Sequence, residues 1–352
     1  VHDAGSFCFN QVVPGYFSRI DSEGHYSNGS CCGNDTASER SMVRKYIVDS
    51  VNYWADEYHL DGFRFDLVGL LDTDTINEIV NTVHEKHPDI IFYGEGWTLE
   101  TTLTKDGYKM ATQVNSAETP DFAYFNDTIR DGLKGNVFDT KTLGFVSGGE
   151  NFESTIAQCF MGAAEWCSSP SQTINYASCH DNLTLIDRIS RSTPNASRED
   201  RIRMNNLSAA IYMSAQGIPF LQAGEEMLRT KQKSDGGFDE NSYASPDSVN
   251  SLKWDNLNEE EYLNVYNYYK GLIAFRKAHP ALHMTNAEDV AANLSTVEGT
   301  DSGVVALEMK GGANGDSAKG MFFIFNSNNE EKKISLPEGS WDVYINGEKA
   351  GT

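Results

Sequence analysis

The sequence predicts an α/β fold built on a parallel sheet, followed by a small antiparallel β domain. Helical and strand-like segments alternate five times between about residue 36 and residue 278, and short strand-like segments divided by turns follow Pro280. Strands that alternate with helices form βαβ units, whose strands run parallel. Five units fit either an open doubly wound sheet or a (β/α)8 barrel without its first three strands, because a complete barrel needs eight.

The first unit begins with a helix. Thr36 and Glu39 have the spacing of a capping box, and apolar residues then recur at helical spacing over about five turns. These residues are Met42, Tyr46, Ile47, Val51, Trp54 and Tyr58. The helix leads to the strand in "LDGFRFDL". The second unit has a helix that begins near "DTDT" and precedes the strand in "DIIFYGEGW". Its apolar face consists of Ile76, Ile79, Val80 and Val83.

Three further strands and two helices complete the α/β part. The strands are predicted within residues 121–127, 173–179 and 217–224. Ser197 and Asp200 open the helix before the last of these strands, and another helix covers about residues 259–278. The strands after Pro280 are "GVVALEMK", "GMFFIFN", "KKISL" and "WDVYI", with "GGANGDSAKG" as a hairpin loop. We therefore predict an α/β domain over residues 1–280 and an antiparallel β domain over residues 281–352.

The composition excludes several classes of function. With 51 acidic and 28 basic residues, the net charge of −23 disfavours nucleic acids and anionic membranes as partners and favours a neutral or cationic ligand. No apolar run approaches the roughly 20 residues that span a bilayer. The six cysteines form no zinc-like CxxC pairs and are too few for a disulfide scaffold in 352 residues.

Polar side chains stand where the predicted strands end. Asp66 ends the first strand, Glu95 the second, and His180 and Asp181 the fourth. A single strand-end Asp most often caps the next helix. Because the carboxyl ends of parallel strands form one rim, however, three such carboxylates are expected to converge in one cleft.

The neighbours of these carboxylates suggest different roles. Arg64 and Asp66 share one strand face, which supports a structural ion pair as readily as a catalytic carboxylate kept ionised by a cation. Glu95 lies between two glycines and beside Trp97, an environment that would desolvate it and raise its pKa, as a general acid requires. Core packing is an equally good explanation of Trp97.

Two reaction classes use such a set of residues. Glycoside hydrolysis needs a carboxylate nucleophile and a protonated acid on either side of the scissile bond. A metal-dependent hydrolase also uses Asp, Glu and His, but it needs several histidines at strand ends, and His180 is alone there among eight histidines. The residues therefore favour glycoside hydrolysis.

Three motifs carry a family resemblance. "DGFRFDL", "YGEGW" and "SCHDN", in this order, resemble the second, third and fourth conserved regions of the α-amylase superfamily of glycoside hydrolases. The segments "GNDTASERSMVRKYIVDSVNYWADEYHLDGFRFDL", "HDNLTLIDRI" and "ENSYASPDSVNSLKW" are most similar to type I pullulanases, which cleave α-1,6 linkages in pullulan, amylopectin and glycogen. The resemblance covers nearly the whole chain and implies a (β/α)8 TIM-type barrel.

The resemblance also implies roles for the site residues. Asp66 would be the nucleophile and Glu95 the general acid/base of a retaining double displacement, with the two carboxyls roughly 5 to 5.5 Å apart. Asp181 would be a third carboxylate that hydrogen-bonds the sugar, with Arg64 and His180 in the same subsite. Weaker candidates for the glucan-binding wall are Trp97, Asn182, Asn241, Tyr243 and Asp247.

The first conserved region of the superfamily is not in this chain. "VHDAGSFCFNQVVPGYF" resembles the segment directly after that region, so His2 and Asp3 are not its Asp and His. The resemblance implies that barrel strands one to three lie upstream, so that the chain holds a barrel lacking roughly its first three strands and a β domain about one strand short. We expect such a fragment to be unstable or inactive alone, since it exposes parallel strand edges.

Other interpretations stay open from the sequence. They are an α-1,4-acting amylase, an isoamylase-like debranching enzyme, a non-catalytic α-glucan-binding fragment and a metal hydrolase. The leading interpretation requires no cofactor. Calcium has structural roles in the superfamily, but the sequence assigns no ligands to it. The expected partner is an α-glucan such as pullulan, starch or glycogen, and an extracellular or cell-surface bacterial setting is favoured over a cytoplasmic one.

Overall fold

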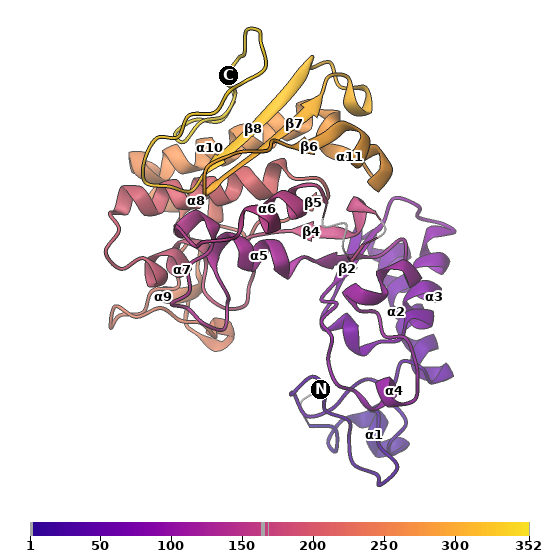
Figure 1. Cartoon of the computed structure of the whole chain (residues 1–352). Helices are drawn as coiled ribbons and strands as arrows, with labels where there is room; N and C mark the ends of the chain where they lie inside the picture. Colours follow the sequence, from indigo (N-terminus) through magenta and orange to yellow (C-terminus); the bar gives the residue numbers. More distant parts are fainter. Residues whose placement is uncertain (1–2, 163–165, 168, 352) are drawn as a thin grey trace. The chain divides into compact units, whose positions relative to one another are not determined.

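A computed structural model of the chain describes residues 3–162, 166–167 and 169–351 (Figure 1). The chain divides into two compact units, which we call the first and second unit. The first unit comprises Val1–Phe125 and Glu165–Thr173, and the second comprises Asn126–Ala164 and Ile174–Thr352. His2 lies outside the described residues. It is predicted not to be the conserved His of the superfamily's first conserved region.

The first unit contains a parallel sheet of three strands, β1 (Gly62–Phe65), β2 (Ile91–Gly94) and β3 (Ala123–Phe125). Its helices are α1 (Cys8–Val12), α2 (Ser41–Tyr58), α3 (Thr73–His84) and α4 (Thr102–Lys105). The predicted apolar face of α3 is buried, and Asp72 caps the helix by accepting a 2.9 Å hydrogen bond from the Thr75 amide. That face packs with Val48, Val51 and Ala55 of α2 into one core.

The structure corrects two expectations about α2. The helix begins at Ser41 after Arg40, with no side-chain cap, so the predicted capping box of Thr36 and Glu39 is wrong. Glu39 instead accepts a hydrogen bond of 3.0 Å from the buried Arg19. Several of the apolar residues that predicted the helix are exposed, namely Met42, Tyr46, Trp54 and Tyr58. The buried face of the helix consists of Val43, Val48, Val51 and Ala55, and Val51 alone among these belongs to the predicted apolar set.

Two further parallel strands and the helices α5 to α11 belong to the second unit. β4 (Thr173–Asn175) pairs with β5 (Ile218–Pro219). The helices are α5 (Asp127–Lys134), α6 (Glu153–Phe160), α7 (Leu185–Ser192), α8 (Arg198–Ser214), α9 (Asp247–Asn250), α10 (Glu260–Ala278) and α11 (Ala287–Asn293). Ser197 caps α8 as predicted, by accepting a hydrogen bond from the Asp200 amide. The sequence predicts one helix between β4 and β5, whereas the structure has two. The helix that is not predicted, α7, is only eight residues long, so its periodicity is short.

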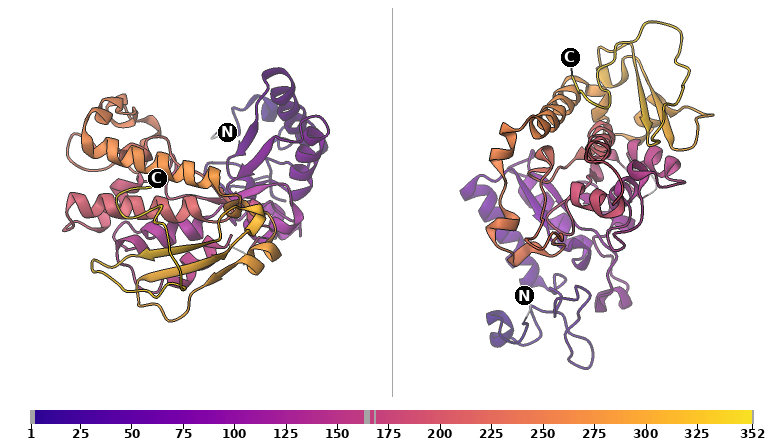
Figure 2. Two further views of the ribbon diagram at one scale, coloured as in Figure 1. Left: turned by 90° about the horizontal axis from the view of Figure 1, so that it is seen from above. Right: turned by 90° about the vertical axis from the view of Figure 1, so that its left-hand side faces the viewer.

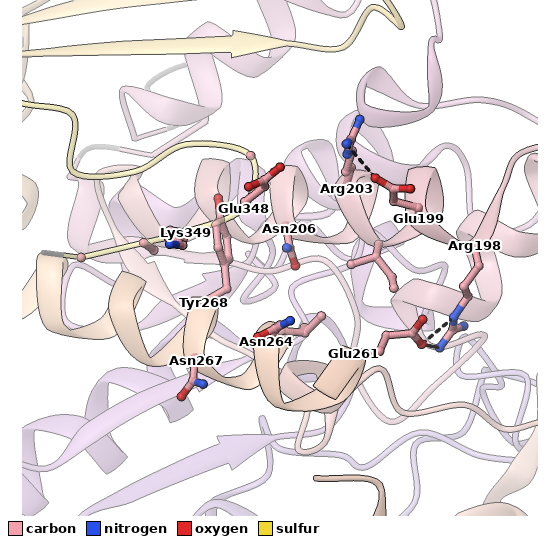
Figure 3. Close-up of a pocket in the computed structure, with 15 residues that line it drawn as sticks. Arg198, Glu199, Arg203, Asn206, Glu261, Asn264, Asn267, Tyr268, Glu348 and Lys349 are labelled. Atoms are coloured by element: carbon pink, nitrogen blue, oxygen red, sulfur yellow. Dashed lines mark hydrogen bonds and ion pairs between the residues drawn. The ribbon is translucent and has the colours of Figure 1, made fainter. Parts of the chain in front are cut away.

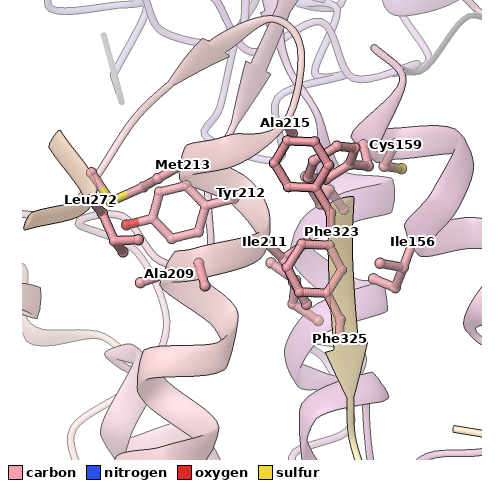
Figure 4. Close-up of a cluster of buried hydrophobic side chains, with 14 of the residues drawn as sticks. Ile156, Cys159, Ala209, Ile211, Tyr212, Met213, Ala215, Leu272, Phe323 and Phe325 are labelled. Carbon is pink, nitrogen blue, oxygen red and sulfur yellow. The ribbon is translucent and has the colours of Figure 1, made fainter. Parts of the chain in front are cut away.

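An antiparallel sheet of three strands completes the second unit. β6 (Leu294–Thr296) pairs with β7 (Val304–Lys310), and β7 pairs with β8 (Gly320–Asn326) across the predicted hairpin loop. Figures 1 and 2 show this sheet beside the helices of the unit. Figure 4 shows Phe323 and Phe325 of β8 within a cluster of buried side chains. Both contact Phe160 of α6, with ring centroids 5.0 and 5.5 Å apart. The sheet and the helices therefore share one hydrophobic core. The domain boundary predicted at residue 280 stays a prediction.

Two predicted strands do not form. Residues 332–336 and 341–345, which are "KKISL" and "WDVYI", have no strand structure, and the bridge between Ile345 and Ala350 is the single pairing found there among the described residues. Leu336 and Val343 are exposed, so neither segment has a buried face that would favour a strand. The expected α/β fold with a parallel sheet and a small antiparallel sheet is otherwise confirmed. Among the described residues, no helix combines the length and the apolar character that crossing a bilayer requires.

Candidate active site

In the first unit, one arginine contacts both predicted catalytic carboxylates. Arg64 on β1 places Nη1 2.6 Å from Oδ1 of Asp66 and Nη2 2.7 Å from Oε1 of Glu95. The strand register explains this arrangement, because Phe65 of β1 pairs with Gly94 of β2 and the next residues are Asp66 and Glu95. The sequence predicts an ion pair of Arg64 with Asp66 alone. The second ion pair, to Glu95, depends on the strand register, which side-chain spacing within one strand does not reveal.

Glu95 is buried and held from two sides. Its side chain is 9 % exposed, and Oε2 accepts a hydrogen bond of 3.0 Å from the Leu67 amide. Leu67 adopts a left-handed conformation with φ of 44°, which is uncommon for a leucine and found mainly where other interactions impose it. Nothing in the sequence signals this contact. It fixes Oε2 of Glu95, while Arg64 contacts Oε1.

Burial raises the pKa of the Glu95 carboxyl above its usual range. The hydrogen bond from Leu67 and the charge of Arg64 oppose the rise, while the neighbouring Asp66 carboxylate adds to it. The Asp66 side chain, by contrast, is 72 % exposed. One guanidinium thus bridges a buried carboxyl whose pKa is raised and an exposed carboxylate. A general acid and a nucleophile require two such different environments.

The glycine after Glu95 is required by packing. A Cβ atom on Gly96 would lie 2.4 Å from the ring of Tyr124, which is itself buried. The backbone that carries Glu95 can therefore lie against this ring only with glycine at this position. Trp97 follows and is half-buried.

In the second unit, His180 and Asp181 follow β4 and line a cleft of about 370 Å³. Nε2 of His180 lies 3.5 Å from Oδ2 of Asp181, and both side chains are mostly exposed. Asn241 and Tyr243 line the same cleft, so the structure brings four of the predicted residues together. Their predicted convergence with Asp66 and Glu95, which belong to the first unit, stays a prediction.

The remaining predicted residues have other positions. Asn182 directly follows Asp181 in a left-handed conformation with φ of 59°. Asp247 is the first residue of α9 and does not line the cleft. Its main-chain carbonyl accepts hydrogen bonds from Ser251 and Lys253. The structure therefore places Asp247 in a helix end beside the cleft wall, where it has a local structural contact.

Lys231 supports the loop of His180 and Asp181, and the sequence does not reveal this role. Its side chain is buried, and Nζ donates hydrogen bonds of 2.7 Å to the His180 carbonyl and 2.9 Å to the Asn182 carbonyl. Its own amide donates to Oδ2 of Asp187 at 2.7 Å. Burial lowers the pKa of Lys231. In the sequence this lysine lies in "RTKQK", which has the composition of a solvated segment.

Glu225 supports the same loop from within the core. It begins a short 3₁₀ helix, Glu225–Met227, and its carboxyl accepts hydrogen bonds from Ser178 at 2.5 Å, Tyr212 at 2.7 Å and Tyr269 at 3.0 Å. Ser178 lies two residues before His180. Burial raises the pKa of Glu225. No periodicity in the sequence marks this glutamate as buried.

Among the described residues, no three or more His, Cys, Asp and Glu side chains form a group that could hold a metal ion. Calcium also binds main-chain and amide carbonyl oxygens, so structural calcium in this chain stays an expectation without assigned ligands.

Comparison with known proteins adds an independent line of information. Residues 32–264 match the family described as "Alpha amylase, catalytic domain", and residues 290–349 match "Pullulanase, all-beta domain". The chain is 41 % identical to a pullulanase of Bacillus subtilis over 292 residues, which cover 81 % of this chain and 39 % of that protein. It is 30 % identical to pullulanase A of Streptococcus pneumoniae over 346 residues, 85 % of this chain and 27 % of that protein.

Solved structures agree with this similarity. The crystal structure of a Paenibacillus barengoltzii pullulanase in complex with maltohexaose and α-cyclodextrin matches with a TM-score of 0.93 and 41 % identity. The match covers 99 % of this chain and 54 % of that one. The chain thus spans about half of the length of this relative and less of the others.

Proposed function

The chain belongs to the α-amylase family of glycoside hydrolases, and we propose that it carries the catalytic residues of an enzyme that cleaves α-1,6 branch linkages in pullulan, amylopectin or glycogen. The observation that carries this proposal is the bridge from Arg64 to Asp66 and Glu95, one exposed and one buried. The similarity to pullulanases over most of the chain supports the choice of linkage. The net charge of −23 suits a neutral glucan.

The proposed reaction is a double displacement. Asp66 attacks the anomeric carbon while Glu95 donates its proton to the departing glycosidic oxygen, so the C–O bond breaks and a glycosyl ester on Asp66 forms. Glu95, now ionised, takes a proton from a water molecule, which attacks the same carbon and releases Asp66. The anomeric configuration is retained because the carbon is inverted twice.

Each environment suits its role in this scheme. The buried Glu95, whose pKa is raised, holds the proton that the leaving group needs. Arg64 stabilises negative charge on Asp66 before the attack and on Glu95 after proton transfer. We assign His180 and Asp181 to hydrogen bonds with the sugar hydroxyls, and Asn241 and Tyr243, in the same cleft, to the neighbouring glucose units. We propose that none of these steps needs a metal ion, and activity that persists in strong chelator would rule out the alternative of a metal-dependent hydrolase.

We further propose that a segment upstream of this chain covers the exposed face of α2. Tyr53, Trp54 and Tyr58 form an exposed aromatic group there, with the Trp54 and Tyr58 rings 4.4 Å apart. Exposed aromatic groups of this kind commonly mark a surface that another element covers. In the first unit, β1 has one strand partner among the described residues, β2. Both observations support barrel strands that precede this sequence.

The decisive test is Asp66→Asn in the full-length protein, with pullulan as substrate. We expect hydrolysis to fall by about 10³-fold or more, because the amide cannot form the glycosyl ester. Asp61→Asn is the matched control, since Asp61 is exposed and lies just before β1. Unchanged hydrolysis in Asp66→Asn would refute the mechanism.

The products separate the alternatives. Maltotriose indicates cleavage of α-1,6 linkages, whereas panose indicates an α-1,4-acting amylase. Cleavage of amylopectin but not pullulan indicates an isoamylase-like enzyme. Glucan binding without any hydrolysis indicates a non-catalytic binding protein.

A further inference from the structure

A second cavity of the second unit shares no lining residue with the His180 cleft. It has a volume of about 780 Å³ and lies between α8, α10 and the segment Gly347–Gly351 (Figure 3). Small-molecule sites in proteins commonly have volumes of about 300 to 1,000 Å³. The cavity is therefore large enough for a ligand of several rings, and the proposed reaction does not use it.

The charged side chains of this cavity balance one another. Arg198 contacts Oε1 of Glu261 with two nitrogens, at 2.7 and 2.9 Å, and Arg203 lies 2.8 Å from Oε1 of Glu199. Glu348 and Lys349 add one charge of each sign. The lining is thus neutral as a whole, although the chain carries a net charge of −23. This balance favours a neutral ligand over an anion or a cation.

One buried amide in the cavity has an oxygen without a partner. Asn206 of α8 is 5 % exposed, and no hydrogen-bond partner of its Oδ1 occurs among the described residues. An unsatisfied buried oxygen is costly, and such groups are usually paired with a ligand or an ordered water molecule. Figure 3 shows Asn206 and Asn264 of α10 on the two helices that bound the cavity. Two carboxamides therefore offer donors and acceptors from opposite walls.

Apolar side chains from both helices form another part of the lining. They are Ile202 of α8 and Val265 and Tyr268 of α10, and the Tyr268 ring is fixed because its hydroxyl donates a 3.1 Å hydrogen bond to the Asn346 carbonyl. A site with carboxamides, paired charges and apolar side chains matches a ligand that has hydroxyl groups at its rim and C–H groups on its faces. Sugars have this character, whereas a peptide would bring its own charges or unpaired backbone groups.

We propose that this cavity is a second binding site for a neutral oligosaccharide, a segment of an α-glucan chain. The choice of an α-glucan over another neutral saccharide rests on the function proposed above. A site of this kind retains one part of a polysaccharide while another part is cleaved, and so raises the effective concentration of substrate at the catalytic residues.

The test measures binding in the full-length Asp66→Asn protein, so that the ligand is not consumed. With saturating maltohexaose, we expect slower amide hydrogen exchange in residues 198–206 and 261–268, which line the cavity. Asn264→Ala removes an exposed carboxamide and Asn206→Leu the buried one. Each is expected to weaken binding at this site by about tenfold or more. Asn81→Leu, an exposed position in α3, is the matched control and should bind as the parent does.

Asn206→Leu also separates binding from folding. Because no described group of the protein pairs with the Asn206 oxygen, a leucine of similar size should leave the melting temperature unchanged or raise it, while binding at this site weakens. Unchanged exchange in both segments at saturating maltohexaose would overturn the proposal, as would full binding by Asn206→Leu. Equal protection by xylohexaose would overturn the α-glucan assignment. Protection by maltohexaose in a full-length parent protein that leaves pullulan intact would refute the proposed function but support this site.

Discussion

The ammonium of Lys231 donates a 2.7 Å hydrogen bond to the main-chain carbonyl of His180, the residue before the predicted third carboxylate. A second hydrogen bond, to the Asn182 carbonyl, holds the loop on the other side of Asp181. Lys231 thus fixes the position of Asp181 by holding the main chain on both sides of it. It is a positioning residue, and its loss should affect both folding and substrate binding.

Lys231→Met removes these hydrogen bonds but keeps much of the side-chain volume. We expect the free energy of unfolding to fall by about 2 to 4 kcal/mol, because two main-chain carbonyls lose the charged donor of a buried lysine. We also expect KM for pullulan to rise more than kcat falls, since the sugar-binding loop is displaced rather than the reacting groups. Denaturant unfolding and steady-state kinetics measure the two effects. Lys233→Met, at an exposed position nearby, serves as the control; equal behaviour of the two variants would contradict the role of Lys231.

Arg64→Met should alter the pH profile of hydrolysis. Arg64 lowers the pKa of Glu95 against the larger, raising effect of burial, so its removal should raise that pKa further. The general acid must be protonated, and the alkaline limb of kcat/KM should therefore move to higher pH. The rate itself should fall by about 100-fold or more, because Asp66 and Glu95 lose their shared cation. The exposed Arg191 provides a comparison, as Arg191→Met should keep the parent profile. An unchanged alkaline limb in Arg64→Met would argue against Glu95 as the acid.

Lys134, at the end of α5, should make stability depend on pH. Burial lowers the pKa of this lysine from 10.5 to about 8. Between these two values the unfolded chain binds more protons than the folded one, so the free energy of unfolding should rise with pH over this window and level off above it. The rise is about 3 kcal/mol. Below pH 8 the lysine is charged in both states and contributes no pH dependence.

The difference between the parent and Lys134→Met isolates this contribution. Denaturant titrations at several pH values between 7 and 11 measure the free energy of unfolding of both proteins. The value for the parent should rise relative to that of Lys134→Met by about 3 kcal/mol over this range. Lys141→Met, at an exposed position, should follow the parent throughout. A constant difference between the parent and Lys134→Met would show that the pKa of Lys134 is the same in the folded and the unfolded chain.

The isolated 352-residue chain should fold poorly or associate. The aromatic face of α2 and the strand edge of β1 would both be exposed to solvent. Size-exclusion chromatography and calorimetry should therefore detect aggregates or a broad transition, and pullulan should not be cleaved. Trp54→Lys should reduce association of the isolated chain but destabilise the full-length protein. A monomeric preparation that melts cooperatively and cleaves pullulan would refute the proposal of a missing segment.

The sequence predicts those parts of the structure in which local periodicity and burial coincide. The apolar face of α3, the cap of α8 at Ser197 and the strand ends at Asp66 and Glu95 follow from side-chain spacing alone. The aromatic residues of α2 have the same helical spacing, yet they face solvent in this chain. Periodicity identifies an apolar face but not the element that covers it.

The support of the site was not predictable because it depends on contacts between distant segments. Lys231 reaches the His180 carbonyl across 51 positions of sequence, and Glu225 meets Ser178 across 47. The identity of a lysine or glutamate in the sequence does not reveal whether its side chain is buried. The prediction of a strand in "KKISL" is wrong for a related reason. Alternating apolar and polar residues form a strand only where a partner strand and a hydrophobic surface are available.

The contact of Phe160 with Phe323 and Phe325 has a consequence for how such enzymes can be divided or recombined. If the chain were truncated near residue 280 to obtain a minimal catalytic domain, Phe160 and Ile211 would become exposed to water. The reason is that both belong to the same hydrophobic core as the side chains of β8. Replacement of the antiparallel sheet by the sheet of another protein is therefore expected to disrupt the hydrophobic core that it shares with the helices. In this lineage the sheet and the helices beneath it are expected to be inherited together, and a chimaera should join its parents elsewhere.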